Sequence, residues 1–157
     1  MKTSFKEIAD QLREITIREE AFLTSLSDDT VTGRRNGQGR NAKEILGHLI
    51  DSASNNHQRM VRLQYCEELL FPDYTRQNDQ WIAIQRYGEA PWEELVALWK
   101  HYNLHMARVI GSADPAKGEN FWRDSEGEKI TLRYMTEIYL YHLEMHIGEI
   151  HELAVVK

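Results

Sequence analysis

The stretch TLRYMTEIYLYHLEMHIGEIHELA, residues 131–154, decides how this chain folds. No proline interrupts it, and it opens with Thr131, a residue type that caps the N-termini of helices. The stretch is therefore predicted to be one amphipathic helix that reaches roughly Ala154 and buries one face. Its apolar side chains recur at helical spacing, at Leu132, Met135, Tyr139, Leu143, Ile150 and Leu153.

Three histidines lie in this helix, and two of them share its inward face. His142 and His146 are four residues apart, so their side chains are only about 40° out of line on an α-helix. His151 lies about 140° from His146 and is expected at the surface. Burying two imidazoles without partners is unfavourable, and one metal ion about 2 Å from both rings would satisfy both. The alternatives are a hydrogen-bonded polar seam and a half-exposed pair.

Three more amphipathic helices are expected before residue 131. The first covers residues 4–26, and the second runs from about 42 to 68. Asn41, followed by Glu44 three residues later, has the pattern of a capping box for the second helix. The third begins near Pro91, which suits a first helical turn. Its apolar stripe consists of Leu95, Leu98, Trp99, Tyr102, Met106, Val109 and Ile110.

The connections between these helices differ in length. The glycine-rich stretch GRRNGQGR, residues 33–40, is expected to be a loop. WIAIQRY, residues 81–87, is expected to add a short helix, and DSEGEK, residues 124–129, a turn or a small hairpin. The chain is thus predicted to be all-α, an antiparallel four-helix bundle with long connections between helices 2 and 3 and between helices 3 and 4. The alternative is a smaller helical array packed against a partner chain, and neither requires a sheet.

Composition excludes several classes of protein. Residues 1–157 are expected to form a single helical domain, and a net charge of −6 argues against nucleic-acid binding, which needs clustered Lys and Arg. The single Cys66 rules out an intramolecular disulfide framework and fits a reducing cytoplasm. No signal peptide and no apolar run approaching 18 residues is found, so neither export nor a membrane span is expected.

The second helix offers a third metal ligand. A mononuclear site needs one, and His48 lies among apolar neighbours. His48, Ser52, Asn55 and Arg59 follow at spacings of four, three and four residues, so they form one polar strip beside the apolar stripe. Such a strip on an inward-facing helix indicates the wall of a cleft. The alternative for His48 taken alone is a solvated edge.

Glu149 shares the face of the histidine pair, because it follows His146 by three residues and His142 by seven. It could orient a histidine ligand through a hydrogen bond, or act as a base. Equally, it could be an ordinary glutamate on the helix surface.

The remaining histidines are expected at the surface. His101 and His105 are also four residues apart, and they form a rival pair on the third helix. Their neighbours Lys100 and Arg108 are cationic and disfavour a metal ion. His57, like His151, is assigned no role.

Three segments together resemble the DinB-like superfamily, a group of damage-inducible four-helix-bundle metalloproteins. They are AKEILGHLIDSASNNHQR (residues 42–59), QWIAIQRYGEAPWEELVALWKHYNLH (80–105) and ITLRYMTEIYLYHLEMHIGEI (130–150). The resemblance covers nearly the whole chain beyond the first helix. In that family a His of the second helix and an HxxxH pair of the last helix bind a divalent metal. The resemblance thus implies His48, His142 and His146 as ligands.

This chain departs from the family pattern in two places. Many relatives begin the second helix with Trp-Ser, where Arg40 and Asn41 stand here, and many show Gly-Gln where Gly148 and Glu149 stand. The second departure changes a charge next to the last ligand. Metal preference and substrate choice are therefore not transferred from relatives.

The resemblance implies metal-dependent chemistry, since relatives include thiol-dependent S-transferases, an isomerase and proposed hydrolases. Three imidazoles leave an open position on the ion, where the pKa of a water or of a substrate thiol would fall. The first hypothesis is a divalent-metal-dependent enzyme, a thiol S-transferase or hydrolase, acting on a small molecule. Zinc and nickel are the expected metals, and iron, cobalt and manganese are also compatible. Candidates for catalysis, substrate contact or ligand support are Ser52, Asn55, Arg59 and Glu149.

Two other hypotheses stand beside this one. The chain could be a non-catalytic helical protein that binds metal or forms a stress-related dimer, or a bundle without metal. A homodimer is expected because four Trp and seven Tyr exceed what one small bundle must bury. Those aromatic side chains could equally pack the long connections onto the bundle.

Overall fold

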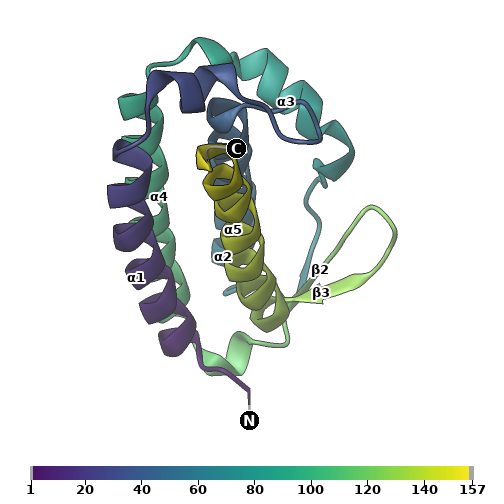
Figure 1. Cartoon of the computed structure of the whole chain (residues 1–157). Helices are drawn as coiled ribbons and strands as arrows, with labels where there is room; N and C mark the ends of the chain where they lie inside the picture. Colours follow the sequence, from purple (N-terminus) through teal and green to yellow (C-terminus); the bar gives the residue numbers. More distant parts are fainter. Residues whose placement is uncertain (1, 156–157) are drawn as a thin grey trace.

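A computed structural model describes residues 2–155 of the chain (Figure 1). Four long helices dominate it, and they confirm the predicted all-α four-helix bundle. The short helix α3 (Asn78–Gln85) lies where WIAIQRY predicted one. The long helices are α1 (Phe5–Thr24), α2 (Ala42–Arg62), α4 (Trp92–Gly111) and α5 (Leu132–Ala154).

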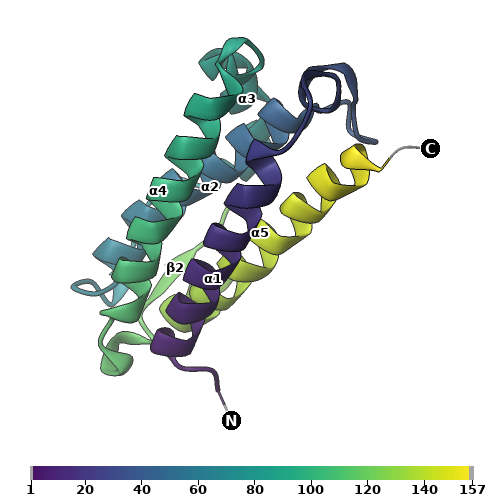
Figure 2. The ribbon, with the colours of Figure 1, turned by 60° about the vertical axis from the view of Figure 1, so that its left-hand side comes forward.

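The helices form a ring that places the last helix beside α2. α1 packs mainly against α4, α4 also packs against α2, and α2 packs against α5. The pairs α1–α4 and α2–α5 are antiparallel, whereas α2 and α4 run in the same direction (Figures 1 and 2). The parallel arrangement follows from the long connection at residues 63–91, which carries the chain back to the end of the bundle where α2 begins.

Side-chain caps fix where the helices begin. The Asn41 side chain accepts a hydrogen bond from the Glu44 amide at 3.0 Å, and the Glu44 carboxylate accepts one from the Asn41 amide at 3.4 Å. Thr131 Oγ1 accepts from the Tyr134 amide at 3.2 Å. Both predicted caps are thus confirmed. Pro91 immediately precedes α4 and serves as its cap position rather than its first turn.

A small three-stranded sheet flanks the bundle, and the sequence did not predict its full extent. β2 (Phe121–Arg123) pairs antiparallel with β3 (Lys129–Thr131), which confirms the small hairpin around DSEGEK. β1 (Glu68–Leu69) pairs parallel with β2. The prediction that the second helix continues to residue 68 is wrong, because α2 ends at Arg62 and the segment beyond it turns to join the sheet.

The inner faces of the helices pack largely as the periodicity predicts. The predicted inward residues of α5 are buried, and Trp99 of α4 is among the largest fully buried side chains. Leu98, which the sequence placed in the stripe of α4, is 48 % exposed, so that assignment is wrong. It lies one residue from Trp99, about 100° around the helix, and only the Trp faces the core. Within residues 2–155, no helix is both long and apolar enough to cross a membrane.

Candidate metal centre

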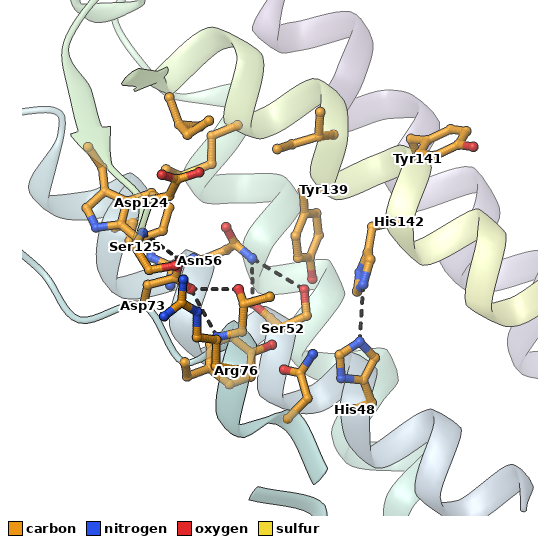
Figure 3. Close-up of a pocket in the computed structure, with 18 of the residues that line it drawn as sticks. His48, Ser52, Asn56, Asp73, Arg76, Asp124, Ser125, Tyr139, Tyr141 and His142 are labelled. Carbon is orange, nitrogen blue, oxygen red and sulfur yellow. Dashed lines mark hydrogen bonds between the residues drawn. The ribbon is translucent and has the colours of Figure 1, made fainter. Parts of the chain in front are cut away.

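Three histidines from α2 and α5 converge inside the bundle. His48 Nε2 lies 3.1 Å from His142 Nε2, and His146 Nε2 lies 3.1 Å from the same atom. The ligand atoms of the three side chains all lie within 4.8 Å of one another. Figure 3 shows His48 and His142 pointing at each other from facing helices. The antiparallel packing of α2 on α5 therefore brings together residues that are far apart in the sequence.

The spacing of these nitrogens fits a metal ion. Two imidazole nitrogens bound at about 2.0–2.1 Å to one ion would be roughly 2.9–3.4 Å apart, for bond angles between the octahedral and the tetrahedral values. The two Nε2–Nε2 distances of 3.1 Å fall in that range. Hydrogen bonds explain these two distances poorly. His142 Nε2 carries either one proton or one lone pair, so it can form one hydrogen bond but not both. A divalent cation would serve all three nitrogens.

Burial keeps two of the three imidazoles in the form that binds metals. Burial, with smaller contributions from the neighbouring charges of His142, His146 and Arg40, lowers the pKa of His48 to about 3. Burial likewise lowers the pKa of His142 to about 4, with a smaller contribution from His146. Neutral imidazole is the ligating species, so a metal ion would displace no proton from either ring near pH 7.

Glu149 holds the third imidazole in place. Its Oε2 lies 2.8 Å from His146 Nδ1 and accepts a hydrogen bond from Asn36 Nδ2 at 3.4 Å. A carboxylate on Nδ1 favours the tautomer with its proton there, which leaves the Nε2 lone pair facing the other histidines. Sequence reasoning missed Asn36, because it lies in the glycine-rich loop before α2, where no periodicity marks an inward side chain.

A cavity of about 540 Å³ opens beside the histidines (Figure 3). His48 and His142 line it, whereas His146 and Glu149 do not. Ser52 and Arg59 of the predicted polar strip also line the cavity. The strip thus does form a cleft wall.

Asn55 is the member of the strip that the cavity lining does not include. Its Nδ2 donates to the Asp51 carbonyl oxygen at 2.9 Å, so the amide folds back on its own helix. Asn56 lines the cavity instead, and its Nδ2 donates to the Ser52 carbonyl oxygen at 2.9 Å. The cavity lining thus adds Asn56 to the predicted face, and the role of Asn55 stays a prediction.

Another part of the cavity wall comes from the connections between the helices. Asp73 accepts hydrogen bonds from Thr75 Oγ1 at 2.6 Å and from the Ser125 amide at 3.0 Å. Burial acts to raise the pKa of Asp73, but these hydrogen bonds outweigh it and lower that pKa to about 2. The ionised Asp73 therefore fastens the β2–β3 turn to the segment before α3. The sequence carried no signal for this long-range contact.

The other histidines stay outside this centre. His101 and His105 are exposed, as predicted. His57 is half-buried and its Nδ1 lies 2.9 Å from the Tyr102 hydroxyl. His151 is exposed as predicted, although its Nε2 contacts a carboxylate of α1. Within residues 2–155, no second group of three His, Cys, Asp or Glu side chains converges in this way.

Comparison with known proteins agrees with this picture. The sequence model described as the DinB superfamily matches residues 11–150. No curated protein matches the chain. The structure of YfiT from Bacillus subtilis, described as a probable metal-dependent hydrolase with an unusual four-helix bundle topology, is similar with a TM-score of 0.82 and 18 % identity. That similarity covers 95 % of this chain and 85 % of YfiT.

A second similar structure is a mutant of mycothiol-dependent maleylpyruvate isomerase. Its TM-score is 0.72 at 13 % identity, and the match covers 99 % of this chain but 65 % of the isomerase. At these identities the two structures establish a shared fold. The activities stated for them belong to those proteins.

Proposed function

The chain belongs to the DinB superfamily, and from this premise we propose that it is a divalent-metal-dependent enzyme acting on a small molecule. His48, His142 and His146 would hold the metal. The observation that carries the proposal is the convergence of three Nε2 atoms, two of them from His48 and His142, which line a cavity of about 540 Å³. Structural metal sites are closed by protein ligands, whereas catalytic sites leave a position for substrate. A three-histidine site beside a cavity has the catalytic arrangement.

The proposed reaction class is hydrolysis or the transfer of a low-molecular-weight thiol. When bound, a divalent ion supplies Lewis acidity that lowers the pKa of a water or of a thiol. We propose zinc or nickel, while iron, cobalt and manganese also accept imidazole ligands. The description of YfiT as a probable metal-dependent hydrolase supports hydrolysis, and the mycothiol dependence of the isomerase supports a thiol.

The protein's own side chains would bind and orient the substrate. Ser52 and Asn56 present polar groups to the cavity between the histidines and Arg59. Glu149 contacts His146 and does not line the cavity, which supports a positioning role rather than that of a base. Asn55 is not assigned a role in catalysis. Cys66 does not line the cavity either, so the nucleophile would come from water or from the substrate.

Metal content and turnover together test this proposal. Untagged protein purified without chelator is expected to contain about one ion per chain, measured by inductively coupled plasma mass spectrometry. His142→Ala should lose that ion, and His101→Ala, which removes an exposed histidine, should keep it. Both variants would be assayed for hydrolysis of ester and amide substrates and for thiol conjugation. Absence of an ion from the wild type, even after incubation with zinc or nickel, would refute the proposal. An ion without any turnover would favour the non-catalytic metal-binding alternative.

A homodimer is also proposed, from exposed side chains of α5, three of which line the cavity as well. Along α5, Tyr134, Ile138, Tyr141 and Met145 form an apolar stripe that remains exposed at helical spacing. Such a stripe on one helix is typical of a helix that packs against another chain. Sedimentation equilibrium should give a dimer for the wild type and a monomer for Tyr141→Glu. Leu70→Glu, at a 92 % exposed position away from the stripe, is the matched control. A monomeric wild type would refute the dimer.

A further inference from the structure

Arg59 lies in the wall of the same cavity, but far from the histidines. It is 5 % exposed and follows His48 on α2, so at about 1.5 Å per residue their backbones are roughly 16 Å apart along the helix. The centre of its guanidinium lies 3.9 Å from the centre of the Trp122 ring and 5.9 Å from that of Phe71. Stacking of this kind holds the plane of the guanidinium and leaves its N–H edge available to a ligand.

The protein leaves this buried cation largely without acceptors. Arg59 Nη2 donates to the Pro72 carbonyl oxygen at a long 3.3 Å, and Nε is buried without a hydrogen-bond partner. Within residues 2–155, Arg59 forms no ion pair with a carboxylate. Burial lowers its pKa, yet a guanidinium stays protonated near neutral pH. A buried, unpaired charge is unfavourable unless a ligand supplies the counter-charge.

Asp73 favours the charged form of Arg59 but does not take this role. Its carboxylate is engaged by Thr75 Oγ1, the Thr75 amide and the Ser125 amide, at 2.6, 3.0 and 3.0 Å. Those hydrogen bonds fix it to the β2–β3 turn. Among the described residues no carboxylate therefore pairs with the guanidinium, which lines the cavity that an acceptor would enter.

We infer that Arg59 binds an oxyanion group, a carboxylate or a phosphate ester, at one end of a small-molecule substrate whose other end reaches His48 and His142. A planar fork of N–H donors matches both kinds of oxyanion. The claim that the other end of the substrate reaches His48 and His142 rests on the proposed function. Oxyanion binding itself does not need the metal. The substrate class is thus an elongated anion rather than a neutral small molecule.

Nuclear magnetic resonance of the full-length, metal-free chain tests the inference. Inorganic phosphate, acetate and the neutral analogue acetamide would be titrated at constant ionic strength in Tris buffer at pH 7.5. The reporters are the Arg59 Nε–H and the Trp122 Nε1–H, which donates to the Phe71 carbonyl oxygen at 2.8 Å beside the guanidinium. Phosphate or acetate should shift both signals saturably, and acetamide should not. The tighter of the two anions identifies the group that the cavity prefers.

Three variants make the test specific. Arg59→Gln should weaken anion binding at least about tenfold, and Arg59→Lys, which keeps the charge and is the safer variant for folding, should weaken it less. Arg76→Gln removes an exposed cation from the same cavity and should change the affinity less than about twofold. Unmoved wild-type signals, or equal losses in the Arg76 and Arg59 variants, would overturn the inference.

The outcome is separable from that of the proposed function. A chain that binds oxyanions through Arg59 but takes up no metal overturns the proposed function alone. If the chain takes up one metal ion but phosphate and acetate do not shift the Arg59 and Trp122 signals, this inference alone is overturned.

Discussion

Two places on α2 bring a histidine against histidines of a neighbouring helix, and they differ in almost every other respect. His48 meets His142 and His146 of α5, and His57 stands beside His105 of α4. In the first group His48 is 3 % exposed and His146 6 % exposed, and His142 is half-buried at the cavity. In the second group, the His57 and His105 rings meet edge to face with centroids 5.1 Å apart, and His105 is exposed.

The difference shows what makes a metal site from histidines at helical spacing. Both neighbouring helices carry an i,i+4 pair, so spacing alone does not separate them. Near α5, three Nε2 atoms face one point, and among residues 2–155 Glu149 alone contacts an outer nitrogen. Near α4, Nδ1 of His57 is already paired with the Tyr102 hydroxyl. Burial and convergence distinguish the candidate centre from a surface cluster.

The largest expected contrast is in metal affinity. His48→Ala removes one of three converging ligands and should lower zinc affinity by more than about 100-fold, beyond the effect of losing a residue that supports a ligand. His57→Ala, on the same helix, should leave affinity unchanged within about twofold. Competition titration against a chromophoric chelator measures both. Equal losses would mean that the comparison between the two histidine groups is wrong.

The stability of the metal-free chain should depend on pH, because folding lowers the pKa of two histidines. Folding lowers the pKa of His48 and His142 from 6.5 to about 3 and about 4. The unfolded chain therefore binds more protons, and stability that is present above pH 6.5 is lost as the pH falls towards 4. Between pH 7.5 and 5 the loss is on the order of 2 kcal/mol for each of the two. Urea unfolding at several pH values measures it.

His142→Gln serves as the control for that measurement. It removes one titrating imidazole and should flatten the pH dependence by about half, because the two shifts contribute similarly. A free energy of unfolding that stays constant from pH 7.5 to 5 in the wild-type protein would contradict the neutral state of His48 and His142.

Removal of the carboxylate behind His146 should have an intermediate effect. Glu149→Gln keeps the size of the side chain but not its charge, so the Nδ1 contact at 2.8 Å loses its ionic acceptor. Zinc affinity should fall by about 10- to 100-fold, with the fold intact. Glu152→Gln changes an exposed glutamate of the same helix and is the matched control. Equal affinities for the two variants would show that Glu149 does not support the ligand.

The smallest effect is expected at the surface cluster. Tyr102→Phe removes the hydroxyl that contacts His57 and should lower the free energy of unfolding by about 0.5–1.5 kcal/mol. Metal content should not change. Thermal unfolding tests the change in stability, and metal analysis of the same samples tests the metal content. Tyr65→Phe, at a 72 % exposed position, is the control. Lost metal in the Tyr102 variant would link two clusters that the structure keeps apart.

Local sequence patterns predicted the parts of the molecule that local interactions determine. Periodicity located the four long helices, and the caps at Asn41 and Thr131 follow from contacts within one helical turn. The alignment of His142 with His146 is equally local. Spacing alone did not decide whether His48 is a third ligand or lies at a solvated edge of its helix. The family resemblance favoured the ligand.

The parts that sequence reasoning missed depend on contacts between distant segments. Asn36 contacts Glu149, and Arg59 stacks on Trp122, across more than one element each. Strand β1 is defined by its pairing with β2, and it lies beyond the end of α2 at Arg62. No pattern along a single segment encodes such pairings, so half of the cavity wall could not be predicted.

The 94 positions that separate His48 from His142 have a consequence for how the folded chain opens. An ion held by both would close a loop that contains α3, α4 and the β2–β3 hairpin. Any fluctuation that parts α2 from α5 would first have to release the ion, and ligands that bind only the folded state suppress such openings in proportion to their occupancy. Metal supply would then set the rate of hydrogen exchange in α2 and α5 more strongly than in α1, which supplies none of the three histidines.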